Sequence, residues 1–377
     1  MKTYKILILG GYGNFGKRIA EGLAHHSNAL ILIAGRDEKK AEQLCRMLNG
    51  KKSGAQFKAT KIDVTTHHFE KNLAALSPNL VIHTAGPFQG QDYKVPHACI
   101  KAGCHYIDLA DDRRFVCDIA SLNDEAQRMG VVVVSGASSV PGLSSAVIDH
   151  YAPDFSQIHS IDCAIAPGNK AERGEATVRG ILAYTGHPIK IWRNKNWETV
   201  FGWMSPRKIN FGGIVGRRWL ANVDIPDLEL FPVRYKTAST VIFQAGLELP
   251  FLHLIMVFMA FLAKKRLVKN WSTLTKPIIC LSRLFANMGS SNGGMRIEIK
   301  GTDHAGQRTT QVWSLFAPNG IGPYIPTMST LILAEKLIAG DVSASGARAC
   351  LGMYSLAEFD QHITEYGIFY TAELSHG

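Results

Sequence analysis

Short apolar runs alternate with longer segments of helical spacing along the first third of the chain. The runs that predict strands lie at residues 5–9, 30–34, 56–64, 80–84, 106–109 and 131–135. The helical patterns between them lie at residues 15–24, 37–48, 68–76, 95–102 and 118–129. Strands that alternate with helices predict a parallel sheet covered on both faces. We therefore expect a doubly wound α/β domain of nucleotide-binding size over residues 1–150.

The pattern changes after residue 150. Apolar and polar residues alternate near 158–165, 239–243, 295–300 and 309–316, which is typical of a mixed or antiparallel sheet. We expect a second, mixed α/β domain for substrate binding and dimerisation over residues 151–322. A C-terminal segment follows at 323–377, helical through residue 338, and its packing against the first domain is left open.

One segment of the second domain is apolar without interruption. Residues 250–263 read PFLHLIMVFMAFLA and are followed by the basic sequence KKRLVKNW. The run is shorter than the ~20 residues that a helix needs to span a bilayer. Two interpretations remain, a helix buried in the domain or at a dimer contact, and a helix lying on an anionic lipid surface.

Composition and charge narrow the classes of partner. Hydrophobic residues make up 46% of the chain and charged residues 19%, which indicates folded domains. The net charge of +10 is compatible with nucleic acid, an anionic membrane surface or small anionic substrates and cofactors, and scattered cations without a nucleic-acid-binding motif argue against DNA or RNA. Seven cysteines without a CxxC pair favour reduced thiols in a cytoplasmic protein and no metal site. The N-terminal MKTYKILILGG is predicted to be a first strand and not a signal peptide.

A glycine-rich turn follows the first predicted strand. Gly11, Gly13 and Gly16 have GxGxxG spacing between a strand and a helix. In this context the glycines allow a tight turn, the approach of a pyrophosphate and close packing of helix on strand. We predict a Rossmann dinucleotide site that includes Tyr12, Asn14 and Phe15 of the same turn.

The end of the second strand favours NADP over NAD. An NAD site usually carries an acidic residue there, whereas this chain reads Ala34-Gly35-Arg36-Asp37. Arg36 could pair with a ribose 2′-phosphate, with Lys39 or Lys40 nearby. Asp37 is expected to cap the next helix.

Two further loops are predicted to line the cofactor. Asp63 and Val64 follow the third strand, where the adenine would lie, although Asp63 could equally be a turn residue. Ala85, Gly86 and Pro87 follow the fourth strand, where the nicotinamide ribose would lie.

Several motifs together resemble the saccharopine dehydrogenase-like oxidoreductase family, through its NADP-binding domain. They are GGYGNFG, the AGR after the second strand, AGPFQG at 85–90, the run from Ala98 to Asp108, and SGASSVPGLSSAVID at 135–149. The resemblance covers the first ~150 residues well and the rest loosely. It implies a nicotinamide cofactor, a Rossmann domain paired with a mixed α/β domain, and often a homodimer. Members act on secondary amines of amino acids or reduce enoyl lipids, and some are lipid-associated proteins of unknown activity.

Amine chemistry requires a group that manages the amine proton. His105, Asp108 and Asp111, with Asp112, are predicted at the carboxyl end of the fifth strand, and we take the first three as catalytic candidates. Arginines of the second domain could hold substrate carboxylates.

Three functional hypotheses follow. The first is an NADP-preferring oxidoreductase that transfers hydride to or from an imine or secondary amine of an amino acid. The second is a membrane-associated reductase of a lipid-like substrate, favoured by the apolar run at 250–263. The third is a non-catalytic scaffold that retains the cofactor.

Overall fold

The computed structural model describes residues 3–51, 54–342 and 344–377, and it divides into two compact units. Unit 1 combines Met1–Gly142 with Pro326–Tyr354, and unit 2 combines Leu143–Ile325 with Ser355–Gly377. The sequence pattern predicts domain limits at residues 150 and 322. In the structure the C-terminal segment is shared between the two units, so each unit contains two separate stretches of chain.

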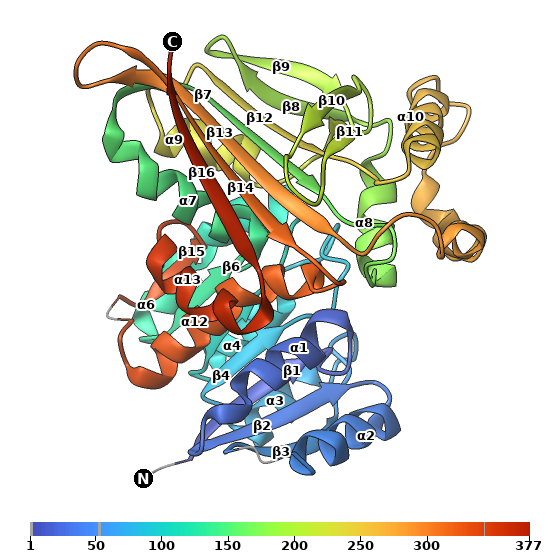
Figure 1. Ribbon diagram of the computed structural model, residues 1–377. Helices are drawn as coiled ribbons and strands as arrows, with labels where there is room; N and C mark the ends of the chain where they lie inside the picture. The colour runs from blue at the N-terminus through green and yellow to red at the C-terminus, as the bar shows by residue number, and fades with distance from the viewer. Residues whose placement is uncertain (1–2, 52–53, 343) are drawn as a thin grey trace. The chain divides into compact units, whose positions relative to one another are not determined.

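Unit 1 is built on a seven-stranded sheet in which every neighbouring pair is parallel. Its order is β15-β6-β5-β4-β1-β2-β3. The strands are β1 (Tyr4–Leu9), β2 (Ala29–Gly35), β3 (Gln56–Lys61), β4 (Leu80–His83), β5 (His105–Asp108), β6 (Val132–Ser135) and β15 (Gly346–Ala349). The predicted doubly wound sheet is confirmed, and β15 adds a strand from the C-terminal segment (Figure 1).

Helices cover both faces of this sheet. Side chains that alternate along β1, such as Leu7 and Leu9, join a buried cluster with α3, α4, η2 and α6. On the other face a Cβ at Gly22 of α1 would contact Leu331 of α12, so these helices pack closely. The helices of unit 1 are α1 (Asn14–Gly22), η1 (Leu23–His25), α2 (Glu38–Asn49), α3 (Phe69–Leu76), α4 (Lys94–Lys101), α5 (Arg113–Cys117), η2 (Asp118–Leu122), α6 (Asn123–Arg128), η3 (Ser139–Leu143, shared with unit 2) and α12 (Ile325–Ala339). The single helix predicted at 118–129 is thus divided into η2 and α6.

Unit 2 is built on a mixed sheet, as the alternating runs predict. Its main path is β10-β11-β12-β7-β13-β14-β16, and β8 pairs with both β12 and β9. The pair β7 and β12 is parallel, whereas β13 is antiparallel to both β7 and β14. The strands are β7 (Phe155–Ala166), β8 (Pro188–Arg193), β9 (Asn196–Phe201), β10 (Arg207–Asn210), β11 (Arg217–Asn222), β12 (Thr240–Ala245), β13 (Gly293–Asp303), β14 (Arg308–Ala317) and β16 (Phe369–His376).

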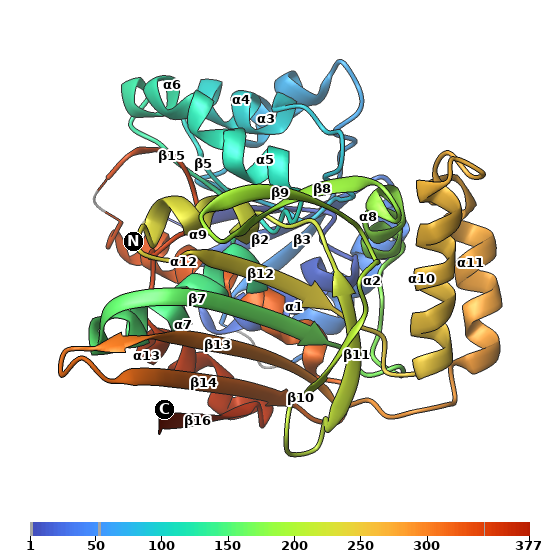
Figure 2. The ribbon, with the colours of Figure 1, turned by 90° about the horizontal axis from the view of Figure 1, so that it is seen from above.

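Helices of unit 2 include two apolar ones that lie side by side beside α8 (Figure 2). They are α10 (Pro250–Lys264), which contains the predicted apolar helix, and α11 (Thr275–Ser282). The others are α7 (Ser144–Tyr151), η4 (Ala152–Asp154), α8 (Glu175–Tyr184), α9 (Asp227–Arg234), η5 (Trp271–Leu274), η6 (Arg283–Phe285), η7 (Gly322–Tyr324), α13 (Leu356–Ile363) and η8 (Thr364–Tyr366). Among the described residues, no helix combines the length and the apolar character that crossing a membrane requires.

Candidate cofactor site and its surroundings

The glycine-rich turn connects β1 to α1 at the carboxyl edge of the parallel sheet. A Cβ at Gly16 would lie 2.5 Å from the Gly10 carbonyl oxygen, and one at Gly11 would lie 2.9 Å from the Ile8 carbonyl oxygen. Only glycine fits these two positions, because the turn and the first helical turn pack directly on each other. At Gly13, in contrast, a Cβ would meet only the Gly10 oxygen, at 3.0 Å, so its outer side is open.

The first turn of α1 is free to receive an anion. Gly13 is the N-cap and supplies no side-chain hydrogen bond, and the first turn contains no acidic residue. The first intrahelical donor is the Lys17 N–H, which bonds to the Gly13 oxygen. The N–H groups of Asn14, Phe15 and Gly16 therefore begin the helix without intrahelical partners, which is the arrangement that binds phosphate. Asn14 also accepts a hydrogen bond from the Arg18 guanidinium through its side-chain oxygen.

The turn lies where the strand order of the sheet reverses. β1 has β2 on one side and β4 on the other, and in such sheets ligands bind outside the carboxyl ends of the strands at this point. The loop after β4 meets the glycine turn there, because Thr84 Oγ1 donates to the Leu9 oxygen at 2.9 Å and a Cβ at Gly10 would lie 3.0 Å from the Ala85 nitrogen. The structure thus places the predicted residues Ala85, Gly86 and Pro87 beside the turn.

The residues at the end of β2 lie next to the glycine turn at the carboxyl edge of the sheet. The Tyr12 ring covers Gly35, and its hydroxyl oxygen accepts a hydrogen bond from the Asp37 N–H at 3.0 Å. Asp37 caps α2 by accepting from the Lys40 N–H, as predicted, and its carboxylate lies 3.7 Å from the Lys40 ammonium. Arg36 is exposed between these groups, and its charge lies near Asp63.

Asp63 and Val64 have different environments in the loop after β3. Asp63 is a turn residue: Oδ1 accepts from the Thr65 N–H at 2.9 Å and from the Thr65 hydroxyl at 2.8 Å. These bonds, with smaller contributions from Arg36 and Lys94, hold the pKa of Asp63 below its ordinary value. Val64 packs partly buried against the core cluster of unit 1. Lys94, which sequence reasoning missed, donates to the Thr66 oxygen at 2.7 Å and adds a second cation here.

The three catalytic candidates do not lie together. His105 is the first residue of β5 and Asp108 is the last, so His105 lies at the amino edge of the sheet. The prediction that His105 lies at the carboxyl end is wrong, because His105 begins the strand and the four residues of β5 separate the two edges by roughly 10 Å. At that edge His105 Nδ1 accepts from the Val132 N–H at 3.0 Å, and burial lowers its pKa.

Asp108 is a buried anchor for two loops. Its Oδ1 accepts from the Ala110 N–H, the Gly136 N–H and the Ser135 hydroxyl, each at 2.9 Å. Burial outweighs these bonds and raises the pKa of Asp108 to about 6. The carboxyl group therefore fixes the chain after β5 and after β6, which is the role of a positioning residue.

Asp111 remains at the carboxyl edge as a candidate for proton transfer. It lies half-buried in the loop after β5, and its Oδ1 accepts from Gln89 Nε2 of the loop after β4 at 3.1 Å. Burial raises the pKa of Asp111. Its neighbour Asp112 instead caps α5 by accepting from the Phe115 N–H.

His83 is a titratable group that the sequence analysis did not select. It ends β4, is fully buried, and its Nδ1 lies 3.0 Å from the Tyr106 hydroxyl. Burial lowers the pKa of His83 to about 4, so the ring is neutral. The sequence could have indicated this residue, because His83 stands directly before TAGPF at the end of an apolar run that predicts a fully buried strand.

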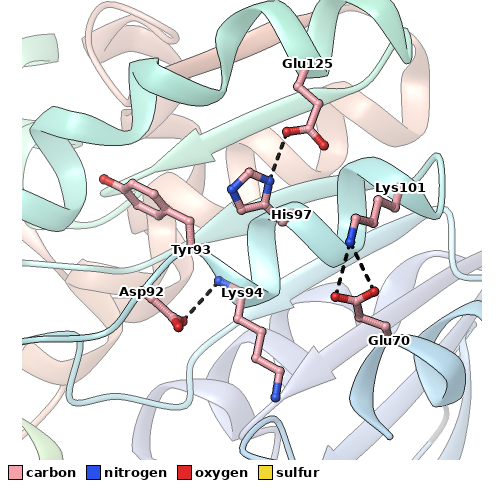
Figure 3. A pocket seen from close by; sticks show the side chains of 7 residues that line it. All are labelled: Glu70, Asp92, Tyr93, Lys94, His97, Lys101 and Glu125. Atoms are coloured by element: carbon pink, nitrogen blue, oxygen red, sulfur yellow. Dashed lines mark hydrogen bonds and ion pairs between the residues drawn. The ribbon is translucent and has the colours of Figure 1, made fainter. Parts of the chain in front are cut away.

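A polar hollow of about 610 Å³ lies elsewhere on unit 1, beside α3, α4 and α6 (Figure 3). Lys101 lies 3.3 Å from Glu70 and His97 lies 2.9 Å from Glu125, so these four polar side chains pair with one another. None of the predicted cofactor or catalytic residues lines it. The lining residues are Glu70, Asp92, Tyr93, Lys94, His97, Lys101 and Glu125.

Potential metal ligands also meet at one place in the described chain. The Nε2 atoms of His25 and His26 each lie 3.7 Å from Glu335 Oε1. No metal site is predicted from the sequence. The two histidines precede β2, so this group lies at the amino edge of the sheet and is separate from the cofactor edge.

Comparisons with known proteins agree with this geometry. Residues 6–134 match the family model described as saccharopine dehydrogenase NADP binding domain. The structure of saccharopine dehydrogenase (L-Glu forming) from Saccharomyces cerevisiae superposes with a TM-score of 0.71, covering 99% of this chain and 100% of that chain at 15% sequence identity. At this identity the likeness shows a shared fold over the whole chain.

Two curated relatives match more locally. A "Lipid droplet localized protein" of Caenorhabditis elegans is 26% identical over 149 residues, covering 37% of this chain and 35% of the relative. A "Trans-acting enoyl reductase" of Mycobacterium tuberculosis is 28% identical over 144 residues, covering 37% of this chain and 34% of the relative. The matches thus span about a third of the length of each relative. Residues 6–134 thus match a saccharopine dehydrogenase NADP binding domain, and the whole chain shares the fold of a saccharopine dehydrogenase, with a Rossmann-type unit.

Proposed function

We propose that this protein is an NADP(H)-dependent oxidoreductase. The observation that carries the proposal is the meeting of the glycine turn and the loop after β4 at the point where the strand order reverses. The fit of a dinucleotide is supported by Gly11 and Gly16, where a Cβ would collide with backbone, and by the uncapped first turn of α1. A bound nicotinamide would donate or accept the hydride.

The preference for NADP is supported by the charges at the end of β2. Arg36 is exposed there, and the carboxylate of Asp37 is committed to the α2 cap and Lys40. Arg36 can therefore pair with a 2′-phosphate, whereas the acid that follows it, Asp37, already bonds to the backbone of α2 and lies beside Lys40. Lys39 and Lys40 would add positive charge from the first turn of α2.

For the substrate we propose an imine or secondary amine of an amino acid. The shared fold with a saccharopine dehydrogenase over 99% of the chain supports this class. Asp111 is the residue we propose for holding the amine proton, because it lies at the cofactor edge and its pKa is raised by burial. Gln89 orients it, and Asp108 positions the loop that carries it.

A second candidate is reduction of a lipid-like substrate. It is supported by the similarity to a protein named trans-acting enoyl reductase and by the exposed apolar side chains of α10. The two candidates differ in substrate and share the cofactor site, so one set of cofactor measurements tests both.

The test is calorimetric titration of the protein and of Arg36→Ala with NADPH and with NADH. We expect the wild type to prefer NADPH, and Arg36→Ala to lose at least about ten-fold in NADPH affinity while NADH affinity stays unchanged. Arg46→Ala, an exposed arginine of α2, is the matched control. Equal loss for both cofactors would contradict the role of Arg36.

Turnover separates an enzyme from a scaffold. With secondary-amine and enoyl substrates offered in turn, we expect Asp111→Asn to lower kcat by about 10²-fold and to leave NADPH affinity unchanged. Failure of the wild type to bind either cofactor would refute the oxidoreductase proposal. Binding without turnover of any substrate would favour the non-catalytic scaffold.

A further inference from the structure

Residues 250–288 of unit 2, which we name the apolar hairpin, form two antiparallel helical arms. The Phe251 ring at the start of α10 packs edge-on against the Phe285 ring at the end of the second arm, with centroids 5.1 Å apart. Trp271 Nε1 donates to the Met259 oxygen at 2.9 Å and closes the other end. Asn169 Nδ2 donates to the Phe285 oxygen at 2.7 Å and ties the hairpin to the loop after β7. The hairpin is therefore an ordered part of unit 2 (Figure 2).

Only one side of α10 is covered by unit 2. His253, Met256, Ala260 and Ala263 are its buried residues, and their spacing defines a single helix face. On that side the backbone of α10 is so close that a Cβ at Gly186 would lie 2.3 Å from the Ala260 oxygen. The opposite face is as apolar as the buried one, since the helix contains no charged residue before Lys264.

Exposed apolar side chains are concentrated on this hairpin. Among the described residues, 17 large hydrophobic side chains are exposed, and ten of them belong to the hairpin. Phe258 is 60% exposed, Leu281 62% and Leu284 74%. The full set is Phe251, Leu254, Ile255, Phe258, Phe261, Leu267, Leu274, Leu281, Leu284 and Met288. A patch of this kind on a folded protein marks a surface that another phase or molecule covers.

The charges of the hairpin all have one sign. Residues 250–288 contain no aspartate or glutamate and six cations, namely Lys264, Lys265, Arg266, Lys269, Lys276 and Arg283. The acid that precedes the hairpin, Glu248, is held inside unit 2 by Arg218 at 3.2 Å and by the Ser290 hydroxyl at 2.7 Å. Three of the cations, Lys265, Arg266 and Lys269, lie on the connection between the helices, at the end of the apolar face.

We infer that the apolar hairpin docks on the surface of a phospholipid membrane that carries anionic headgroups. The apolar side chains would lie at the boundary of headgroups and acyl chains, and the lysines and arginines would contact the phosphates. A second copy of the chain fits less well, because the hairpin has no acidic side chain that could pair with the six cations of the other copy. The 15-residue length of α10 suits a helix that lies in the surface, since a spanning helix needs about 20 residues. This inference does not depend on which reaction the protein catalyses.

Sedimentation with vesicles tests the inference on the full chain. The probes are vesicles of phosphatidylcholine alone and of phosphatidylcholine with about 30% phosphatidylserine. We expect the wild type to bind the anionic vesicles and the double variant Phe258→Ser, Leu284→Ser to lose at least about five-fold in bound fraction. Val233→Ser, which changes a side chain of 70% exposure on α9, is the matched control.

A second variant tests the charges. Lys265→Gln, Lys269→Gln, Lys276→Gln should also lower binding to the anionic vesicles at least about three-fold, and raised salt should act in the same direction. The matched control replaces three exposed lysines elsewhere, Lys58, Lys71 and Lys236, by glutamine. Thermal midpoints within about 2 °C of the wild type would show that these surface changes leave the fold intact.

Three results would overturn the inference. In the first, the wild type binds neither kind of vesicle. In the second, it binds vesicles but neither hairpin variant binds less. In the third, the wild type binds no vesicles and is a dimer, which Phe258→Ser, Leu284→Ser converts to a monomer. Light scattering of the same samples detects the third, in which the hairpin is a contact between copies.

Discussion

Asp108 shows how one residue can have a perturbed pKa without being a catalytic group. Its carboxyl is fully buried, and three donors converge on a single oxygen. The donors stabilise the ionised form, but loss of water around the group costs more, so the pKa rises to about 6. The carboxyl is shared by the loops after β5 and β6, and the first of these also carries Asp111.

Asp108→Asn is expected to change how stability depends on pH. Because the folded-state pKa lies above the ordinary value of 3.8, the wild type gains stability from this group at low pH and loses it as pH rises through 6. The rise in the pKa of Asp108 from 3.8 to about 6 corresponds to roughly 3 kcal/mol of unfolding free energy. We expect the free energy of unfolding of the wild type, relative to Asp108→Asn, to fall by up to that amount between pH 4 and pH 7.

Urea unfolding at pH 4, 5.5 and 7 measures this difference. Asp124→Asn, at an exposed carboxyl on α6, is the control for introducing an amide. The expectation would be contradicted if the free energies of unfolding of the wild type and of Asp108→Asn differed by the same amount at all three pH values. Asp108 would then have the same pKa in the folded and the unfolded chain.

Gly16 sets a steric limit on the cofactor turn. A Cβ there would lie 2.5 Å from the Gly10 oxygen and 2.7 Å from Gly11 Cα, and both are backbone atoms that cannot rotate away. We expect Gly16→Ala to lower the free energy of unfolding by about 1–3 kcal/mol and NADPH affinity by at least about ten-fold. Gly50→Ala, where a Cβ would be 3.3 Å or more from its neighbours, is the control. Unchanged NADPH affinity in Gly16→Ala would place the pyrophosphate elsewhere.

At the scale of elements, α10 depends on a buried neutral histidine. His253 has no exposed surface, its ring lies 5.7 Å from the Trp203 ring, and burial lowers its pKa to about 4. In the unfolded chain the His253 ring binds a proton near pH 6.5, whereas in the folded chain the ring does so only near pH 4. Stability that is present above pH 6.5 is therefore lost as pH falls towards 4.

His253→Phe should reduce this acid sensitivity, because a phenyl ring fills the same space without a titratable nitrogen. We expect the thermal midpoint of the variant to fall less than that of the wild type between pH 7 and pH 4.5, by about 2 °C or more. His304→Phe, at an exposed loop histidine, is the comparison. Parallel decreases in the wild type and His253→Phe would mean that His253 does not carry the effect.

Strands that consist of a buried apolar run could be predicted from the sequence, whereas short strands without such a run could not. The strands β1, β2 and β4 and the glycine turn follow from local pattern, because each is a buried run or a steric requirement. β15 reads GARA and has no strand signal of its own; it is a strand because the edge of β6 offers it hydrogen-bond partners. His105 was placed at the wrong edge of the sheet, because the first residue of a strand lies at its amino end, beside Leu80 of β4. The second arm of the apolar hairpin was missed because Pro277 and polar residues interrupt its pattern.

At the scale of the whole molecule, each unit is completed by the C-terminal part of the chain. In unit 1, Ser329 Oγ donates to the Ser138 oxygen and Thr330 Oγ1 to the Ala137 oxygen, each at 2.7 Å. A Cβ at Gly142 would lie 2.8 Å from Ser329 Oγ, so the two stretches of unit 1 meet where the first one ends. In unit 2, β16 pairs along β14 from Thr309 to Phe316.

This arrangement predicts which fragments fold. Residues 1–142 alone would expose the edge of β6 and the sheet face that α12 covers, and we expect this fragment to unfold without a cooperative transition and to bind no NADPH. Joining residues 1–142 to 326–354 by a short glycine-serine linker should restore a cooperative transition and an NADPH affinity within about five-fold of the full chain, because the two ends already lie close together. Thermal melting followed by circular dichroism, with calorimetric NADPH titration, compares the two fragments. If residues 1–142 alone melted cooperatively and bound NADPH as the full chain does, the C-terminal stretch would be an addition to a domain that is stable without it.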